Sequence, residues 1–216
     1  VREFRQPATA AIGLGIPGRV DVQNGQVYPG GYVDLSCFGV VRHFEGGFGL
    51  PAFADNDGNM ALLAEARLGA ARGIEHAVML TIGTGIGGAI LAGGSIFHGG
   101  GTAGQLGHIS VQMDGKPCSC GRRGCLETES SGTSLKRHLA EAGLPADTRI
   151  SDILKADTAA TRQVLLAWIK PLRAGVDGLI ACFSPELVIV GGGLGAAACE
   201  ALQAVAAESP SFPSKA

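Results

Sequence analysis

Short apolar runs alternate along the chain with segments in which apolar residues recur every three or four positions. The runs are typical of buried strands, and the recurring pattern is typical of helices. We therefore expect strands, the first ending in a turn, at residues 10–20, 51–54, 77–82, 88–91, 109–111 and 187–190. We expect helices at residues 34–49, 57–71, 126–142 and 158–183. Strands that alternate with helices predict an α/β fold.

Local details refine this pattern. Residues 20–28 are predicted to form a hairpin around Asn24-Gly25, a pair that suits a tight turn. Residues 208–216 are rich in Ser and Pro, and we expect a loose tail there. The helix at residues 57–71 is predicted to bury one apolar face, formed by Met60, Leu63, Ala64 and Leu68.

The composition narrows the class of protein. The chain has 216 residues, of which 46% are hydrophobic and 17% charged, so it can bury the core of one large domain or two small ones. The net charge is −2 and no basic tract is present, which disfavours nucleic acid and anionic membranes as partners. No apolar run approaches the roughly 20 residues that a membrane span needs.

Three of the six cysteines lie close together in the sequence. Cys118, Cys120 and Cys125 follow His108 within eighteen residues, and glycines between them allow tight turns. Three thiolates and one imidazole fill the tetrahedral shell of a structural zinc ion. A thiolate site with unpaired thiols elsewhere favours a reducing compartment, so we expect a cytoplasmic protein. The scattered thiols are predicted to be small core residues, at Cys37, Cys182 and Cys199.

Two glycine-rich segments suit contact with phosphate or nucleotide. Residues 81–88 join two strands, which argues against a Rossmann fingerprint or a P-loop because both need a following helix. Backbone N–H groups of such a turn can converge on an anion, and Thr81 and Thr84 add hydroxyls. Gly191–Gly193 end a buried strand before a helix, which allows close approach of a nucleotide. The alternative for both segments is a turn that needs glycine for steric reasons.

A third polar segment, residues 55–59, reads Asp-Asn-Asp-Gly-Asn at a strand end that opens a helix. Its carboxylates and amides can bind a polyhydroxylated ligand, and Asp57 can take a hydroxyl proton as a general base. The alternative is helix N-capping, which Asp and Asn do well. Gln105 and Glu127 flank the thiol run, and a metal-bound His108 has a second ring nitrogen free for a ligand.

Taken together and in this order, the motifs resemble the ROK family of sugar kinases and related repressors, from about residue 12 to 202. The local sequence at residues 55–59 and 83–88 is similar to that of the glucokinase and N-acetylmannosamine kinase branches of this family. The resemblance implies an actin-like, hexokinase-like (ribonuclease H-like) pair of α/β domains with a cleft between them. Residues 1–57 are then a remnant of the small domain, and residues 58–216 form the larger domain with the zinc loop.

The resemblance also implies roles for individual residues in an ATP-dependent kinase that acts on a hexose or an N-acetylhexosamine. Asp57 activates the sugar hydroxyl, Mg²⁺ accompanies ATP, and a homodimer is expected. The sugar-binding site is lined by Asn56, Gln105, His108 and Glu127, and Gly18 and Arg19 can reach the sugar. Thr84 and Gly85 face the ATP phosphates, and the adenosine side is formed by Gly191, Gly192 and Gly193. The structural zinc ion is held by His108, Cys118, Cys120 and Cys125.

The chain departs from the family pattern in three ways. Gln105 stands where the family usually has Glu, which removes a charge from the sugar site. The N-terminal Asp-x-Gly-Gly-Thr phosphate loop is absent, and the chain stops soon after the adenosine motif. We therefore expect a chain truncated at both ends, whose own kinase activity is open. The alternatives are a sugar-responsive repressor that lacks its N-terminal helix-turn-helix, and an inactive sugar-binding module.

Overall fold

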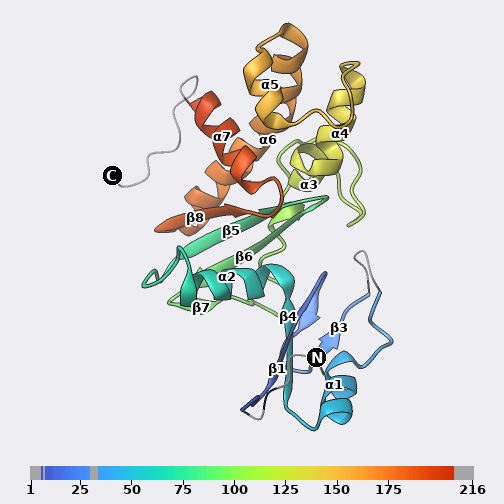
Figure 1. Ribbon diagram of the computed structural model, residues 1–216, viewed down its shortest axis with the longest axis vertical. Coiled ribbons are helices and arrows are strands. Elements are labelled where there is room, and N and C mark those ends of the chain that lie inside the picture. The colour runs from blue at the N-terminus through green and yellow to red at the C-terminus, as the bar shows by residue number, and fades with distance from the viewer. Residues whose placement is uncertain (1–5, 7, 30–33, 207–216) are drawn as a thin grey trace.

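The computed structural model describes residues 6, 8–29 and 34–206, in which strands alternate with helices as predicted (Figure 1). In chain order the elements are β1 (Ile12–Ile16), β2 (Val20–Asp21), β3 (Gln26–Val27), α1 (Val40–Phe48), β4 (Ala52–Asn56), α2 (Asp57–Leu68), β5 (Ala77–Ile82), β6 (Ile86–Ala92), β7 (Ser95–Ile96), the 3₁₀ turn η2 (Leu106–His108), α3 (Leu126–Ser130), α4 (Gly132–Glu141), α5 (Ile150–Ala156), α6 (Ala159–Phe183), β8 (Leu187–Gly191) and α7 (Gly195–Ala206).

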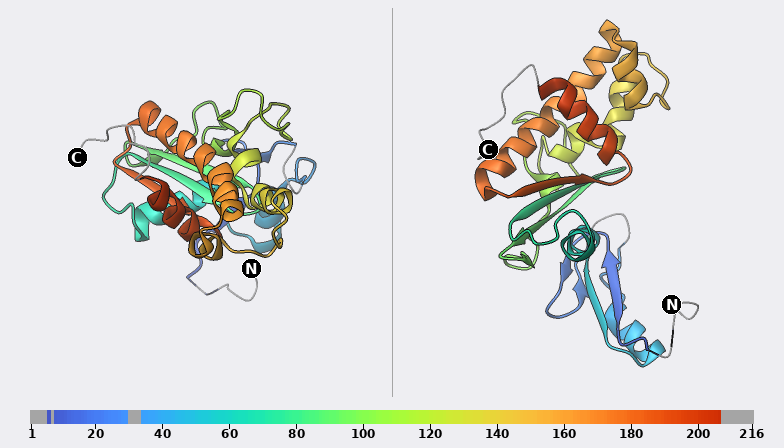
Figure 2. Two further views of the ribbon diagram at one scale, coloured as in Figure 1. Left: turned by 90° about the horizontal axis from the view of Figure 1, so that it is seen from above. Right: turned by 60° about the vertical axis from the view of Figure 1, so that its left-hand side comes forward.

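The larger sheet has the strand order β7-β6-β5-β8 and lies between helix α2 on one face and the group of helices α3–α7 on the other (Figures 1 and 2). Strand β5 pairs antiparallel with β6 and parallel with β8. Its side chains alternate, so that Val78 and Leu80 pack toward helices α4–α7 while Ala77 and Met79 pack toward α2. Both faces of β5 are therefore buried, which explains its continuous apolar sequence.

Trp168 anchors the largest apolar cluster, which helix α6 shares with α4, α5, α7 and the sheet. Its indole Nε1 donates to the carbonyl of Ser131 at 2.9 Å, and its own carbonyl accepts from the Ser130 hydroxyl at 2.7 Å. These two bonds satisfy polar groups in the core and fix the junction of α3 and α4 against α6.

The first part of the chain forms a smaller unit with its own apolar cluster. Strands β1 and β4 pair in parallel, β2 and β3 form the predicted hairpin, and α1 packs beside them. The shared cluster contains Ile16, Val20, Val27, Val40 and Ala54. Strand β4 passes directly into α2 at Asp57, but the division of the chain into two domains there stays a prediction.

The predicted apolar face of α2 is wrong. Gly58, Asn59 and Leu62 are buried, whereas Leu68 is 85% exposed. Leu62 packs with Met79 and Leu91 of the sheet, so the helix is turned by the contact that its first residues make with β6. Local periodicity does not reveal that contact, because it depends on small residues far apart in the sequence.

Other boundaries also differ from prediction. Residues 109–111 form no strand, and only an isolated bridge joins Ser110 to Cys125. The helix expected at residues 126–142 is broken by the extended backbone of Ser131, whose hydroxyl accepts from the Ser134 N–H to begin α4. Helix α1 begins at Val40 rather than at residue 34, and α5 was not predicted. The tail at residues 208–216 lies outside the described residues.

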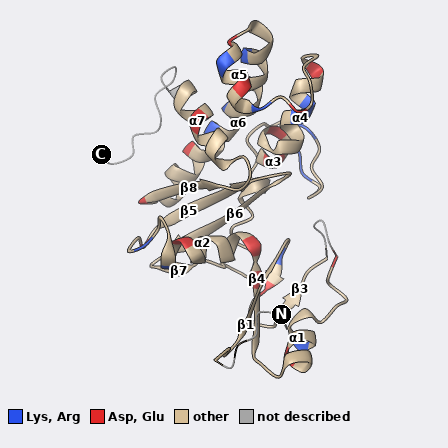
Figure 3. Ribbon diagram, viewed as in Figure 1, with Lys and Arg blue, Asp and Glu red and all other residues tan. Residues whose placement is uncertain are grey.

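Three further observations concern the cysteines, the charged residues and the length of the helices. Cys37 and Cys182 are exposed and Cys199 is half-buried, so their prediction as core residues is wrong. Lys and Arg are interspersed with Asp and Glu along the described chain (Figure 3). None of the described helices has the length and apolar character that crossing a bilayer requires.

The orientation of α2 predicts different effects for two of its leucines. Leu62→Ala removes a fully buried side chain and should lower the free energy of unfolding by about 2–5 kcal/mol. Leu68→Ala, the matched control on the exposed side, should change it by less than about 0.5 kcal/mol. Urea unfolding of both variants measures the difference, and equal effects would contradict this orientation.

Candidate functional site

The predicted site residues gather around the start of β6, at Ile86–Gly88. A Cβ added at Gly58 of α2 would stand 2.8 Å from the Gly88 carbonyl, and one added at Gly88 would stand 2.7 Å from Leu106. A Cβ on Gly107 would overlap the Ile86 carbonyl. The first turn of α2 and the turn η2 therefore contact β6 through backbone, which brings residues 56–59 and 105–108 to the same strand end.

Asn56 and Asp57 play different structural parts there. Asn56 is the N-cap of α2, since its Oδ1 accepts from the N–H groups of Gly58 at 2.9 Å and Asn59 at 3.4 Å. The capping alternative is therefore correct for Asn56. Asp57 is exposed, and its Oδ1 accepts only from the adjacent Gly58 N–H, at 2.9 Å. Its Oδ2 has no partner among the described residues and is available to a ligand.

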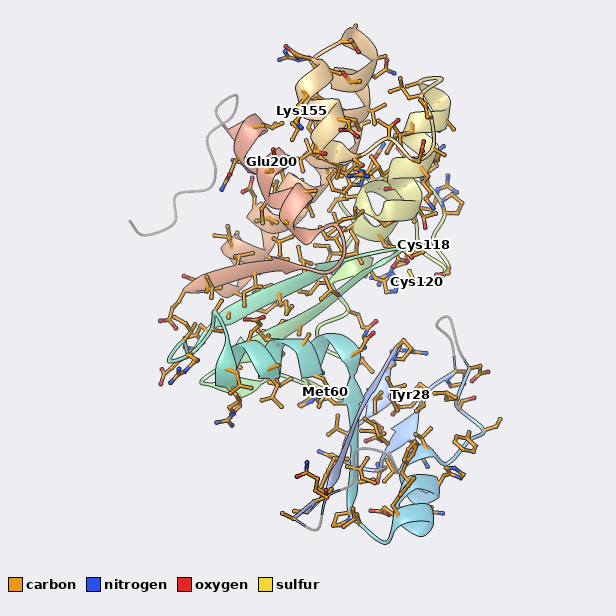
Figure 4. The ribbon with its side chains drawn as sticks, in the orientation of Figure 1. Tyr28, Met60, Cys118, Cys120, Lys155 and Glu200 are labelled. Carbon is orange, nitrogen blue, oxygen red and sulfur yellow. The ribbon has the colours of Figure 1, made fainter. Side chains whose placement is uncertain are left out.

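Gly18 and Arg19 lie next to this strand end. The Asn56 Nδ2 donates to the Gly18 carbonyl at 2.7 Å, which joins the β1–β2 connection to the N-terminus of α2. The Arg19 guanidinium lies over the Tyr28 ring at 5.7 Å and donates to the Pro29 carbonyl at 3.2 Å. Tyr28 is labelled in Figure 4. The exposed cation is thus held by the hairpin at residues 20–28.

Gln105, His108 and Glu127 approach from the other side of β6. Gln105 is the N-cap of η2 and His108 is its last residue, and the His108 N–H donates to the Gln105 carbonyl at 3.0 Å. The Gln105 amide makes no side-chain hydrogen bond with a described residue. Glu127 of α3 accepts from the Ile86 N–H through Oε2 at 2.9 Å, so its carboxylate is fixed against the strand.

The structure brings the four predicted zinc ligands together. One ligand atom from each of His108, Cys118, Cys120 and Cys125 lies within 4.8 Å of every other. The Cys118 Sγ is 3.5 Å from His108 Nδ1, and the Cys120 Sγ is 3.6 Å from Cys125 Sγ. Sulfur ligands bound to tetrahedral zinc at about 2.3 Å lie about 3.8 Å apart, so the four residues fit the ion. Figure 4 shows Cys118 and Cys120 below α3, at the end of the sheet.

The electrostatics of the cluster favour thiolate at its exposed side. Burial acts to raise the pKa of Cys120, but hydrogen bonds from the backbone and side chain of Arg122 and from the neighbouring thiols outweigh it and lower this pKa to about 7. Burial, with the hydrogen bonds to the other two thiols, raises the pKa of Cys125 to about 12. Without metal the buried thiol holds its proton, so a cation is needed to make Cys125 a thiolate ligand.

The loop between β5 and β6 is held by the N-terminus of α4. The Gly132 N–H donates to the Gly83 carbonyl at 2.8 Å, and Thr133 donates to the Thr84 carbonyl through its N–H at 3.2 Å and its hydroxyl at 2.9 Å. C=O and N–H point in opposite directions across a trans peptide, and no described peptide is cis. The N–H groups of Thr84 and Gly85 therefore point away from α4, where they can meet an anion.

Gly191–Gly193 lie beside this loop. Gly191 pairs with Thr81 at the end of β5, and the Leu194 N–H donates to the Ile82 carbonyl at 2.9 Å. Gly192 has φ 85°, and a Cβ there would stand 2.5 Å from the Ile82 carbonyl. The steric reason for glycine thus holds at Gly192. Gly192 and Gly193 are nevertheless exposed, and they lie next to the predicted phosphate loop.

Sequence reasoning missed two contacts of the site. His98 contacts the Asp55 carboxylate with its Nε2 at 2.8 Å. Thr133, whose two bonds fix Thr84, was not singled out either. Each pair joins residues more than forty positions apart, and no local pattern marks such contacts.

Known proteins with similar sequences include kinases and repressors. A model described as the ROK family matches residues 2–212. A glucokinase from Thermotoga maritima is 34% identical over 201 aligned positions, covering 85% of this chain and 63% of that protein. An N-acetylglucosamine repressor from Escherichia coli O6:H1 is 29% identical over 195 positions, covering 84% of this chain and 48% of that protein.

A solved structure agrees with the fold. The ROK family glucokinase from Streptomyces griseus, in complex with glucose and AMPPNP, matches with a TM-score of 0.77 and 28% identity, covering 94% of this chain and 72% of that chain. The likeness confirms the predicted actin-like, hexokinase-like α/β fold. The chain spans less than two thirds of the length of the two curated relatives above.

The geometry of the thiol cluster predicts one zinc ion per chain. Protein purified without chelators should contain one equivalent by metal analysis, and Cys120→Ser should lower that content. Cys182→Ser, at an exposed thiol outside the cluster, is the matched control. Removing the metal should lower the melting temperature, because binding energy at a structural site is folding energy. Zinc-free protein that melts unchanged on adding zinc would contradict the prediction.

Proposed function

The chain belongs to the ROK family, and from that membership we propose that the whole protein transfers the γ-phosphoryl group of ATP to a hydroxyl of a hexose or an N-acetylhexosamine. The observation that carries this proposal is the free carboxylate of Asp57. It lies at the strand end where the phosphate-type loop at residues 83–85 and the turn η2 also meet. The relatives named glucokinase support the same reaction class.

Asp57 is the general base of the proposed reaction. Its Oδ2 accepts the proton of the attacking hydroxyl while the hydroxyl oxygen forms a bond to the γ-phosphorus. The bond between that phosphorus and the bridging oxygen breaks, and its electron pair leaves with ADP. The bond from Gly58 to Oδ1 leaves Oδ2 as the free oxygen, which supports this assignment.

The phosphate donors are the N–H groups of Thr84 and Gly85, with the adenosine beside Gly191–Gly193. Their support is the orientation of the two peptides, which is fixed by Gly132 and Thr133. Mg²⁺ bound with ATP supplies the charge neutralisation that phosphoryl transfer needs. Donors held before the reaction stabilise the developing charge without having to reorganise.

The sugar is proposed to contact residues from both predicted domains. Asn56, with Gly18 and Arg19 beside it, belongs to residues 1–57, whereas the amide of Gln105 comes from residues 58–216. His108 turns Nδ1 toward Cys118, so Nε2 on the opposite side of the ring is available to a hydroxyl. Glu127 has its second oxygen available, since only Oε2 accepts from Ile86. Amide, imidazole and carboxylate groups together suit a polyhydroxylated ligand.

The metal is proposed to be structural, because four protein ligands leave no open position on zinc. Its effect on the sugar site is to fix the ring of His108. The six free thiols favour a reducing cytoplasm. A homodimer stays a prediction from the family resemblance.

A sugar-responsive repressor is the second candidate, favoured by the identity to the N-acetylglucosamine repressor over 84% of this chain. The reading frame before Val1 separates the two candidates. An Asp-x-Gly-Gly-Thr segment there supports the kinase, and a helix-turn-helix supports the repressor. Sugar binding without turnover, in protein that carries the Asp-x-Gly-Gly-Thr segment, would indicate an inactive sugar-binding module.

Asp57→Asn should reduce turnover of the full-length protein by about 10²–10⁴-fold, because the amide cannot take the proton. Sugar affinity should change little. A coupled ADP assay measures the first effect and isothermal titration measures the second. Asp147→Asn, at an exposed carboxylate elsewhere, is the control. Near-normal turnover of Asp57→Asn would limit that residue to a structural part at the start of α2.

Gln105→Glu should tighten binding of glucose-like or N-acetylated hexoses. A carboxylate accepts hydrogen bonds about twice as strongly as a neutral amide. Titration with a panel of hexoses measures the change, and Gln163→Glu on the exposed side of α6 is the control for added charge. Unchanged affinity across the whole panel would remove Gln105 from the sugar site.

A further inference from the structure

The side chain of His98 joins two segments of the proposed site. Its Nε2 lies 2.8 Å from Asp55 Oδ2, and the two side chains are 33% and 16% exposed. Asp55 is the residue before Asn56 at the end of β4, whereas His98 follows β7 and begins the loop that leads to Gln105. Neither residue belongs to the proposed base, sugar, phosphate or metal groups.

The second oxygen of Asp55 acts on the N-terminus of α2. Its Oδ1 accepts from the Asn56 N–H at 2.7 Å and from the Asn59 Nδ2 at 2.8 Å. Asn59 is only 4% exposed, and its Oδ1 has no hydrogen-bond partner among the described residues. The bond to Asp55 therefore sets the orientation of that amide. The Asp55 carboxylate thus makes three contacts: with the backbone just before Asp57, with Asn59 in the first turn of α2, and with His98.

The loop after His98 has few other constraints. Residues 99–104 include four glycines, and Gly99, Gly101 and Gly104 have φ between 55° and 108°. Glycine gives a chain more conformational freedom than any other residue, so such a loop is costly to order. The His98 carbonyl accepts from the N–H groups of Gly101 at 2.8 Å and Ala103 at 3.0 Å. His98 therefore fixes the base of the loop through its backbone and fixes it to β4 through its side chain.

We propose that His98 is a positioning residue, which acts through Asp55 to set Asp57 relative to Gln105. The first residue supplies the proposed base and the second contacts the proposed sugar, so the His98–Asp55 contact sets the distance between the hydroxyl and its base. This inference rests on the proposed kinase function. It adds a residue that touches neither sugar nor nucleotide.

The test compares three substitutions of His98 in the full-length protein. His98→Phe keeps a ring but removes the donor. His98→Gln places an amide nitrogen near the position of Nε2, whereas the amide of His98→Asn falls short of it. His76→Phe, at an exposed histidine directly before β5, is the control. Turnover, KM for sugar and KM for ATP are measured for each.

His98→Phe and His98→Asn should lower kcat by about ten- to a hundredfold, the cost of a displacement of about 1 Å at a reacting group. KM for ATP should stay unchanged, because the phosphate loop is held by α4 instead. His98→Gln should recover most of the turnover. A purely structural role would lower stability without separating the effect on kcat from that on KM for ATP. It would also not give His98→Gln a higher turnover than His98→Asn. Wild-type kcat in both His98→Phe and His98→Asn would overturn the proposal.

Asp55→Asn provides a double-mutant cycle. If His98 acts through Asp55, the effects of Asp55→Asn and His98→Phe on kcat should be strongly non-additive. Additive effects would overturn the proposal. If His98→Phe does not fold, the comparison of His98→Gln with His98→Asn decides the question, because both replace the ring by a neutral amide.

Amide hydrogen exchange separates this inference from the proposed function. Peptides covering residues 55–59 and 99–106 should exchange faster in His98→Phe than in His98→Gln, whether or not the protein is a kinase. Absence of turnover on any hexose in the wild-type protein would overturn the kinase function. In that case, faster exchange of residues 55–59 and 99–106 in His98→Phe would still support the contact between these two segments. Unchanged exchange in both segments would overturn the His98 proposal itself.

Discussion

The arrangement of the proposed site depends on close packing at three glycines. Gly58 and Gly107 let the first turn of α2 and the turn η2 each approach the backbone of β6, and Gly88 leaves room on that strand for the Leu106 side chain. A methyl group at any of them would meet a carbonyl or Leu106 at less than van der Waals distance. The polar side chains around Asp57, Gln105 and Glu127 are grouped because these small residues lie between them.

Polar contacts then fix the groups that the glycines bring together. Asn56 and Asp55 hold the start of α2, Glu127 holds the first residue of β6, and Thr133 holds the loop before it. Most of these bonds run from a side chain to backbone. They fix the course of the chain at the site and leave Asp57 and Gln105 with atoms available to a ligand.

The sequence predicts the apolar strands of the larger sheet and the hairpin at Asn24-Gly25, because those signals are local. It also predicts that His108, Cys118, Cys120 and Cys125 come together, since they are close in the chain and glycines limit their arrangement. It fails for the buried face of α2, which is set by contact with β6 rather than by the periodicity of the helix. It fails equally for His98 and Asp55, which lie 43 positions apart.

The bonds between α4 and the loop at residues 83–84 also change the strength of the loop's own donors. The N-terminus of an α-helix carries roughly half a positive charge. Here that end of α4 is directed at two carbonyl oxygens. A peptide whose oxygen accepts a hydrogen bond is polarised, and its N–H becomes a stronger donor. The Thr84 and Gly85 N–H groups thus carry added positive charge, so the positive end of the α4 dipole extends one peptide length beyond the helix.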